Sequence, residues 1–278
     1  MATSSFMYDA VVIGGGPAGL QATLTLARVH RRVLMLDSGS YRNDPARHMH
    51  NIVAHDGTPP ADFRAAAQQD LAAYDTVTIR TDAATAVGVD GEGFRVEIGD
   101  DVVTARGLIL ATGVRDRLPD KPGLAELFGD AVAHCPFCHG HEFADRPVAV
   151  LGDATHLVGL MGPVASSVTM LDEATVERLE RAGDGARVVF ADGSTAEYGG
   201  IFVSTRLEQS APFAEQLGLT LLPSGCVEVD VMGRTSLPGV HAAGDLAHVA
   251  ALPMPMSSVL VAAASGQVAA GALVAHLM

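Results

Sequence analysis

A glycine-rich turn near the start of the chain constrains its fold more than any other feature. The turn GGGPAG spans residues 14–19 and follows an apolar run at residues 10–13. A helix expected at residues 18–29 and a strand at 32–36 lead to Asp37, about twenty residues beyond the glycines. Such glycines permit a tight turn and let the backbone approach a pyrophosphate, while an acid at this distance binds a ribose hydroxyl. The pattern predicts a dinucleotide-binding unit, and the alternative, a plain tight turn, does not require Asp37.

A pair of cysteines, Cys135 and Cys138, is the second strong signal. Two residues between them hold the sulfurs close enough to cycle between dithiol and disulfide, and this spacing lowers a thiol pKa toward the working range. Together with the glycine turn, the pair indicates electrons passing between a flavin and a disulfide. Zinc binding with His139 and His141 is the alternative, but the sequence lacks a second ligand pair at regular spacing. We therefore expect no metal.

Composition excludes several classes of protein. The 278 residues suffice for two domains, and 48% of them are hydrophobic, so a substantial core is expected. A net charge of −14 argues against nucleic acid and against an anionic membrane as partners. Three cysteines do not make a disulfide scaffold, and residues 1–6 show no secretory signal. A cytoplasmic enzyme is the simplest expectation.

The apolar stretch at residues 259–278 raises the question of a membrane span. Alanine and glycine dominate it, and Ser265, Gln267 and His276 interrupt it. We therefore expect a buried helix that packs closely through small residues.

Hydrophobic patterning predicts two successive α/β segments. The first contains a helix at 61–74, a strand at 76–80, a hairpin formed by 94–98 and 102–104, and a buried strand at 107–110. Residues 119–123 are expected to cross between domains. The second segment is expected to place strands at 147–151, 167–171, 186–190 and 201–203.

Two short segments extend the dinucleotide motif. One is Ala111-Thr112-Gly113 at a strand end, and the other is Ala243-Gly244-Asp245 before the last helix. In sequence with the glycine turn they resemble the FAD domain of flavoproteins with two dinucleotide-binding domains. The resemblance implies that the aspartate reaches the ribityl and pyrophosphate region and that the next helix directs its N-terminus at the isoalloxazine.

The chain as a whole resembles the low-molecular-weight thioredoxin reductases. It is most similar to their FAD-dependent dithiol oxidase branch, which forms disulfides in natural products such as gliotoxin and holomycin. The segments that carry this resemblance are RNDPA at 42–46, HMHN at 48–51, HDGTPP at 55–60 and CPFCHGHE at 135–142. The resemblance implies an α/β fold with two Rossmann-like domains. A discontinuous FAD domain would comprise residues 1–118 and 207–278, and a shortened NADPH-type domain with the cysteine pair would comprise 119–206. It also implies a homodimer.

The resemblance assigns roles to individual residues. Cys138 would contact the flavin as the charge-transfer thiolate, and Cys135 would exchange with substrate. His139 stands where the reductases carry a proton-moving acid, and histidine suits that task because its pKa lies near neutrality. A serine pair replaces the Arg-Gln pair of the reductases, so flavin contacts there would be mainly through the backbone. The residues expected to contact FAD are Gly14, Gly16, Pro17, Ala18, Gly19, Asp37, Ser38, Arg42, His50, Asn51, Ala111, Thr112, Gly113, Gly244, Asp245, Ser257 and Ser258.

The second dinucleotide motif is eroded. In the segment GDATHL at 152–157, Ala154 stands where the fingerprint requires glycine, and Leu157 stands where it requires glycine or alanine. Asp153 adds negative charge near the pyrophosphate position. Asp172 and Glu173 stand where the reductases place basic residues for the 2′-phosphate. The sequence predicts that NADPH binding is lost.

Three functions remain open on these observations. The first is oxidation of a small-molecule dithiol to a disulfide with molecular oxygen as acceptor. The second is a disulfide reductase fed by NAD(P)H or by another carrier. The third is a flavin-binding partner without turnover, against which the retention of both cysteines and His139 speaks.

Several residues have no assigned role. His48, His50 and His55 either line the flavin or substrate pocket or are polar loop residues. Cys226 is expected to be a small buried hydrophobe. Met254 and Met256 either wall an apolar pocket or simply pack.

Overall fold

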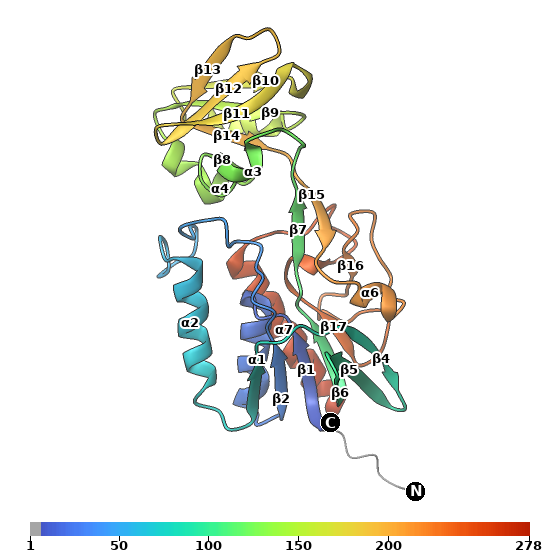
Figure 1. Ribbon diagram of the computed structural model, residues 1–278. Coiled ribbons are helices and arrows are strands. Elements are labelled where there is room, and N and C mark those ends of the chain that lie inside the picture. Colours follow the sequence, from blue (N-terminus) through green and yellow to red (C-terminus); the bar gives the residue numbers. More distant parts are fainter. Residues whose placement is uncertain (1–6) are drawn as a thin grey trace, which may run out of the picture. The chain divides into compact units, whose positions relative to one another are not determined.

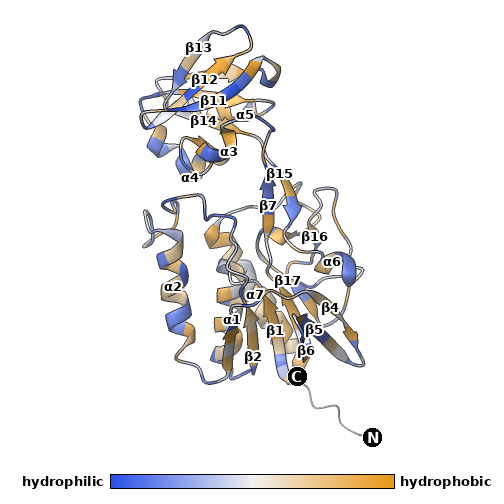
Figure 2. Cartoon of the chain, viewed as in Figure 1, coloured by the Kyte–Doolittle hydropathy of each residue, from blue (hydrophilic) through white to orange (hydrophobic). Residues whose placement is uncertain are grey.

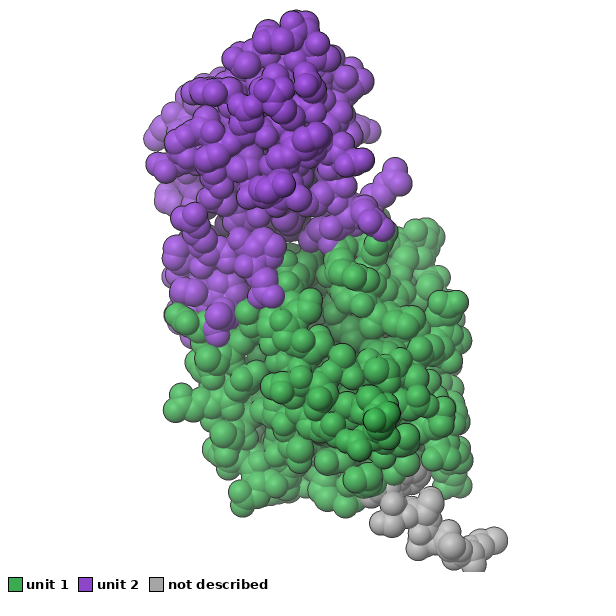
Figure 3. All heavy atoms as spheres, viewed as in Figure 1, with its two compact units in different colours: residues 1–42, 62–115, 207–278 green, residues 43–61, 116–206 purple. Residues whose placement is uncertain are grey.

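The computed structural model describes residues 7–278, which form two compact units (Figure 3). The first unit comprises the described residues through 42, together with 62–115 and 207–278; the second comprises 43–61 and 116–206. The expectation of no secretory signal concerns residues 1–6, which lie outside the described residues.

A twisted, mostly parallel sheet forms the centre of the first unit. Its strand order is β3-β2-β1-β6-β5-β4, and β17 pairs with the end of β6 (Figure 1). The strands are β1 (Tyr8–Ile13), β2 (Val33–Leu36), β3 (Val77–Arg80), β4 (Ala86–Asp90), β5 (Gly93–Ile98), β6 (Asp101–Leu110) and β17 (Val240–Ala242). Strands β1 and β2 are buried on both faces, as parallel strands covered by other elements usually are. Figure 2 accordingly colours β2 and the later part of β1 hydrophobic.

Strand β6 corrects one prediction. The sequence pattern suggested a hairpin strand at 102–104 and a separate strand at 107–110, whereas the structure has one strand from Asp101 to Leu110. Its first half pairs antiparallel with β5, and its second half pairs parallel with β1 and β17. The two halves have different neighbours, so their burial patterns differ. The sequence therefore suggested two separate strands.

Helices α1 (Pro17–Arg28) and α7 (Val259–Leu277) pack against each other in the first unit (Figure 1). A side chain at Gly266 would collide with the Ala18 backbone, so the close approach depends on glycine there. The buried residues of α7 are largely small, as predicted, but only one face of the helix is buried, so the expectation of a buried helix is wrong for its other face. By length and composition alone α7 could also cross a membrane, but its small-residue face is occupied by α1.

The first unit also contains most of a twelve-residue helix, which begins in the second unit, together with short elements. They are α2 (Pro60–Leu71), α6 (Phe213–Gln216), β16 (Val227–Glu228), η3 (Gly244–Leu246) and β18 (Ala247–His248). The predicted helix at 61–74 thus ends three residues early, at Leu71. The chain crosses between the units within β7 (Val114–Arg117) and β15 (Arg206–Gln209), which pair as a two-stranded sheet.

The second unit contains a four-stranded parallel sheet and a three-stranded antiparallel sheet. The parallel sheet has the order β10-β9-β14-β8, and the antiparallel sheet has the order β11-β12-β13. The strands are β8 (Val132–Ala133), β9 (Pro147–Leu151), β10 (Ser167–Leu171), β11 (Val176–Ala182), β12 (Gly185–Phe190), β13 (Thr195–Tyr198) and β14 (Gly200–Val203). The helical segments are α3 (Leu124–Leu127), α4 (Pro136–His139), η1 (His141–Phe143), α5 (His156–Met161) and η2 (Glu173–Thr175).

The four strands predicted for this segment, β9, β10, β12 and β14, are confirmed. Strands β11 and β13 were not predicted, because their alternating polar residues resemble loop composition.

Residues 43–61 group with the second unit, which differs from the predicted division of the chain. Pro45 packs against Gly129, and Arg47 lies 3.7 Å from the carboxylate of Asp130. These contacts join residues about eighty positions apart in the sequence, so no local sequence pattern predicts them.

Candidate active site

The glycine turn between β1 and α1 forms a cradle of backbone. A side chain at Gly14 would collide with the Ala111 carbonyl, and one at Gly19 would collide with the Gly14 carbonyl. Gly14 also has φ +120°, which favours glycine. By contrast, a Cβ at Gly16 would meet no atom within 4 Å, so this face of the turn is open. The cradle therefore fits a pyrophosphate placed at the N-terminus of α1.

Asp37 follows β2 and is almost fully buried, with 3% exposure. Its carboxylate accepts hydrogen bonds from the Tyr41 hydroxyl at 2.6 Å and from the Gln68 amide at 3.2 Å. The Arg64 guanidinium stacks 3.7 Å above the Tyr41 ring. These partners orient the predicted ribose-binding carboxylate.

The sequence did not predict the two side chains, Tyr41 and Gln68, that donate hydrogen bonds to Asp37. Tyr41 could have been found, because it lies four residues beyond the acid. Gln68 could not, because it comes from α2 and only the fold brings it near.

Most of the predicted flavin residues meet at one edge of the first unit. Ala111, Thr112 and Gly113 follow β6, and Gly244 and Asp245 follow β17. Strands β1, β2, β6 and β17 run parallel, so their carboxyl ends share this edge with the glycine turn and with Ser38.

Two further contacts tighten this edge. The Arg42 guanidinium lies 2.7 Å from the Asp245 carboxylate, and both side chains are less than 20% exposed. Ser258, next to Ser257, caps α7 by accepting a hydrogen bond from the Val261 amide at 3.0 Å. The cradle, the Asp37 carboxylate and these charged groups are residues that could hold FAD.

The cysteine pair lies in the second unit at the start of α4. The Sγ atoms of Cys135 and Cys138 are 2.7 Å apart, so the pair is placed to cycle between dithiol and disulfide. The amides of Cys138 and His139 both donate to the Cys135 carbonyl at 3.2 Å. Pro136 at the first helical position sets the backbone angle that a helix start requires. Among the described residues, the structure contains no cluster of three His, Cys, Asp or Glu that could hold a metal.

His139 is held as a neutral base. Its Nε2 lies 3.3 Å from the Gly129 carbonyl oxygen, which can only accept a hydrogen bond, so Nε2 carries the hydrogen. Nδ1 therefore keeps its lone pair, and it is buried without a hydrogen-bond partner among residues 7–278. Burial lowers the pKa of His139, opposed by the Gly129 hydrogen bond and by the charge of Glu142. A neutral imidazole next to the cysteines can accept a proton from a thiol.

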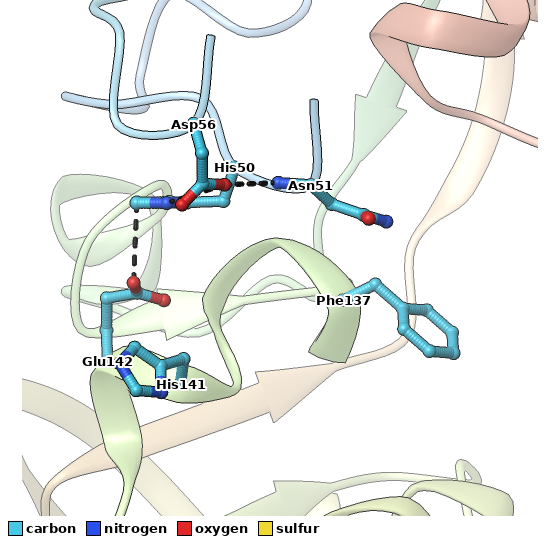
Figure 4. Close-up of a pocket in the computed structure, with 6 residues that line it drawn as sticks. All are labelled: His50, Asn51, Asp56, Phe137, His141 and Glu142. Carbon is cyan, nitrogen blue, oxygen red and sulfur yellow. Dashed lines mark hydrogen bonds and ion pairs between the residues drawn. The ribbon is translucent and has the colours of Figure 1, made fainter. Parts of the chain in front are cut away.

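A pocket of about 300 Å³ lies beside α4 within the second unit (Figure 4). It is lined by His50, Asn51, Asp56, Phe137, His141 and Glu142, a set that we call the Phe137 pocket. His50 and Asn51, which we predicted to contact FAD, thus line this pocket. Asp56, Phe137 and Glu142 fall in the segments that carry the family resemblance, and the sequence did not predict that they line a pocket.

Other residues without an assigned role are also placed. The rings of His48 and His50 are 6.4 Å apart. Cys226 is 1% exposed, and burial raises its pKa, as expected of a small buried hydrophobe. Met254 and Met256 are more than half exposed, so they do not simply pack in the core.

The second dinucleotide motif lies at the turn after β9. Leu157 is 3% exposed and packs in the hydrophobic core of this unit, in the place where the fingerprint requires a small residue. Glu173 places a carboxylate oxygen 3.7 Å from the position of a Cβ on Gly152. Helix α5 is only six residues long. The turn thus presents negative charge where a second pyrophosphate would bind.

The comparisons with known proteins agree with this site. The model of the pyridine nucleotide-disulphide oxidoreductase family matches residues 8–154 and 164–267. The thioredoxin reductase tcpT of Claviceps purpurea is 32% identical over 100% of this chain and 97% of its own length. A probable thioredoxin reductase of Arthroderma benhamiae is 31% identical over 86% of this chain and 74% of its own. The crystal structure of HlmI superposes with a TM-score of 0.89 at 31% identity, covering 97% of this chain and 92% of that one.

The fold and the cysteine pair define a thioredoxin reductase-like flavin disulfide oxidoreductase. The chain belongs to the pyridine nucleotide-disulphide oxidoreductase family. The predicted fold class, with two Rossmann-type sheets, and the predicted cofactor, FAD, are confirmed.

Proposed function

We propose that the protein oxidises a small-molecule dithiol to a disulfide, with molecular oxygen as the acceptor and without NADPH. The observation that carries this proposal is the turn after β9. Leu157 fills core space where a small residue would let the helix approach the strand, and Glu173 places a carboxylate near Gly152, so an anionic dinucleotide meets a widened turn and a negative charge. Electrons must then enter from the thiol side.

The cysteines and His139 supply the thiol chemistry. In the proposed reaction His139 Nδ1 accepts the proton of one substrate thiol, and the resulting thiolate attacks Cys135 Sγ. The Cys135–Cys138 bond breaks, Cys138 leaves as the thiolate, and a mixed disulfide forms between the substrate and Cys135.

The second substrate thiolate then attacks the substrate sulfur of that mixed disulfide, which closes the product disulfide and releases Cys135. The substrate has lost two electrons and two protons, and the cysteine pair has gained them. When bound, FAD would supply the redox chemistry that passes two electrons and two protons from the cysteine dithiol to oxygen, giving hydrogen peroxide.

The competing function is an NAD(P)H-dependent disulfide reductase, which the similarity to proteins named thioredoxin reductase favours. An anaerobic titration of the flavin absorbance separates the two. We expect NADPH and NADH to leave the flavin oxidised, dithiothreitol to bleach it, and air to restore the colour with release of hydrogen peroxide.

The matched control is Cys135→Ser, in which dithiothreitol should no longer bleach the flavin. Rapid stoichiometric bleaching by NADPH would establish the reductase and refute the oxidase.

A further inference from the structure

The Phe137 pocket combines an apolar surface with negative charge beside the redox cysteines. Phe137 stands between Cys135 and Cys138 in the chain, and its ring is 67% exposed. Figure 4 shows that the ring projects from α4 away from His50, Asp56 and Glu142. An exposed aromatic ring next to reactive sulfurs suits contact with an apolar molecule.

Two carboxylates give the pocket its charge. His50 lies between them, with Nε2 3.4 Å from Glu142 and Nδ1 3.6 Å from Asp56. No lysine or arginine lines the pocket in the part of the chain that the structure describes. The nearby cation Arg47 lies against Asp130 instead. Two histidines, His50 and His141, also line the pocket, but a neutral imidazole cancels no carboxylate charge, so the potential in the pocket is negative at a pH where histidines are neutral.

Hydrogen bonds within the loop that carries His50 and Asp56 hold its conformation. The Met49 amide donates to the Thr58 carbonyl at 2.9 Å, which closes the loop at its base. Within it, the Asn51 amide donates to the Asp56 carboxylate at 2.7 Å, and Asn51 adopts φ 62° to do so. The Asp56 charge is therefore held in place before a substrate arrives.

We propose that the Phe137 pocket selects dithiols that carry a positively charged amine on an apolar body and disfavours dithiols that carry a carboxylate. This inference rests on the proposed dithiol oxidation and adds its substrate class. An ammonium group meets the carboxylates of Glu142 and Asp56, while the apolar body lies on the Phe137 ring. The same two carboxylates repel a carboxylate on the substrate.

The test compares three dithiols at pH 8, where histidine side chains are generally neutral. They are 2-amino-1,4-dimercaptobutane as the cation, dithiothreitol as the neutral reference and dihydrolipoate as the anion. Peroxide release gives kcat/KM for each. The intrinsic thiol reactivities cancel when the cation-to-anion ratio of the wild type is compared with that of a variant.

We expect Glu142→Gln to lower the cation-to-anion ratio by about threefold or more, the size of one partly exposed ion pair. Asp56→Asn should lower it in the same direction, and its amide oxygen can still accept from the Asn51 amide. High salt should compress the wild-type ratio toward that of the variants. The matched control is Glu126→Gln on α3, which removes an exposed charge that does not line the pocket and should leave the ratio unchanged.

The outcomes separate the inference from the proposed function. Turnover of all three dithiols with the same ratio in the wild type, Glu142→Gln and Asp56→Asn would overturn the charge selection and leave the oxidase intact. Absence of flavin bleaching and peroxide with every dithiol would refute the oxidase itself, and the substrate inference would fall with it.

Discussion

His241 makes the stability of the first unit depend on pH. It lies in β17 with 2% exposure, and neither ring nitrogen has a hydrogen-bond partner among the described residues. Burial lowers the pKa of His241 to about 4, repulsion from His276 and Arg234 lowers it further, and Asp230 acts in the opposite direction. The fold therefore holds this imidazole in its neutral form.

The sign and size of the effect follow from linkage. The unfolded chain, with a histidine pKa of about 6.5, binds more protons than the folded chain between pH 4 and 6.5, so stability falls as pH falls through that window. The contribution of neutral His241 to the free energy of unfolding is fully present above pH 6.5. A difference of about 2.5 pKa units, at about 1.4 kcal/mol each, amounts to about 3.5 kcal/mol in full, of which about 3 kcal/mol is lost by pH 4, where the folded imidazole is half-protonated. By pH 5 the loss should be about 2 kcal/mol.

The perturbation is His241→Leu, which replaces the ring by an apolar side chain of similar size. Urea denaturation followed by circular dichroism, from pH 8 to pH 5, measures the free energy of unfolding. The variant should lose about 2 kcal/mol less than the wild type over this range.

The control is His30→Asn, which removes an exposed histidine at φ 54°, a conformation that asparagine tolerates. It should keep the wild-type pH dependence. An equal loss of stability in His241→Leu and the wild type would refute the reasoning, because the buried imidazole would then not be the group that titrates.

Three further predictions concern the cysteines, the base and the helix pair. Cys135→Ser should show a long-wavelength flavin absorbance band that Cys138→Ser lacks, and a band that follows Cys135 instead would reverse their roles. His139→Ala should slow the dithiol half-reaction most at low pH, because substrate thiols there are protonated and need a base; stopped-flow bleaching at pH 6 and pH 9 should show the deficit shrinking as pH rises. Gly266→Ala should destabilise the first unit by about 1–3 kcal/mol, because its Cβ collides with α1 backbone, whereas Gly271→Ala meets open space and should be neutral or stabilising in urea denaturation.

The sequence by itself determined the features that depend on neighbouring residues. The glycine turn, the strand before it, the helix after it and Asp37 all fall within thirty residues of one another, so their spacing carries the geometry. The same holds for Cys135 and Cys138, whose spacing brings their sulfurs together. The small residues of the last helix likewise predicted close packing before its partner helix was known.

The tertiary structure decided everything that joins distant parts of the chain. Arg42 meets Asp245 across 203 positions of sequence, and His50 reaches Glu142 only because residues 43–61 fold into the second unit. The tautomer of His139 follows from the Gly129 carbonyl, which no motif around the histidine predicts. Such contacts have no local periodicity, because they depend on which elements the core brings side by side. Their charges and hydrogen bonds therefore become visible only once the chain is folded.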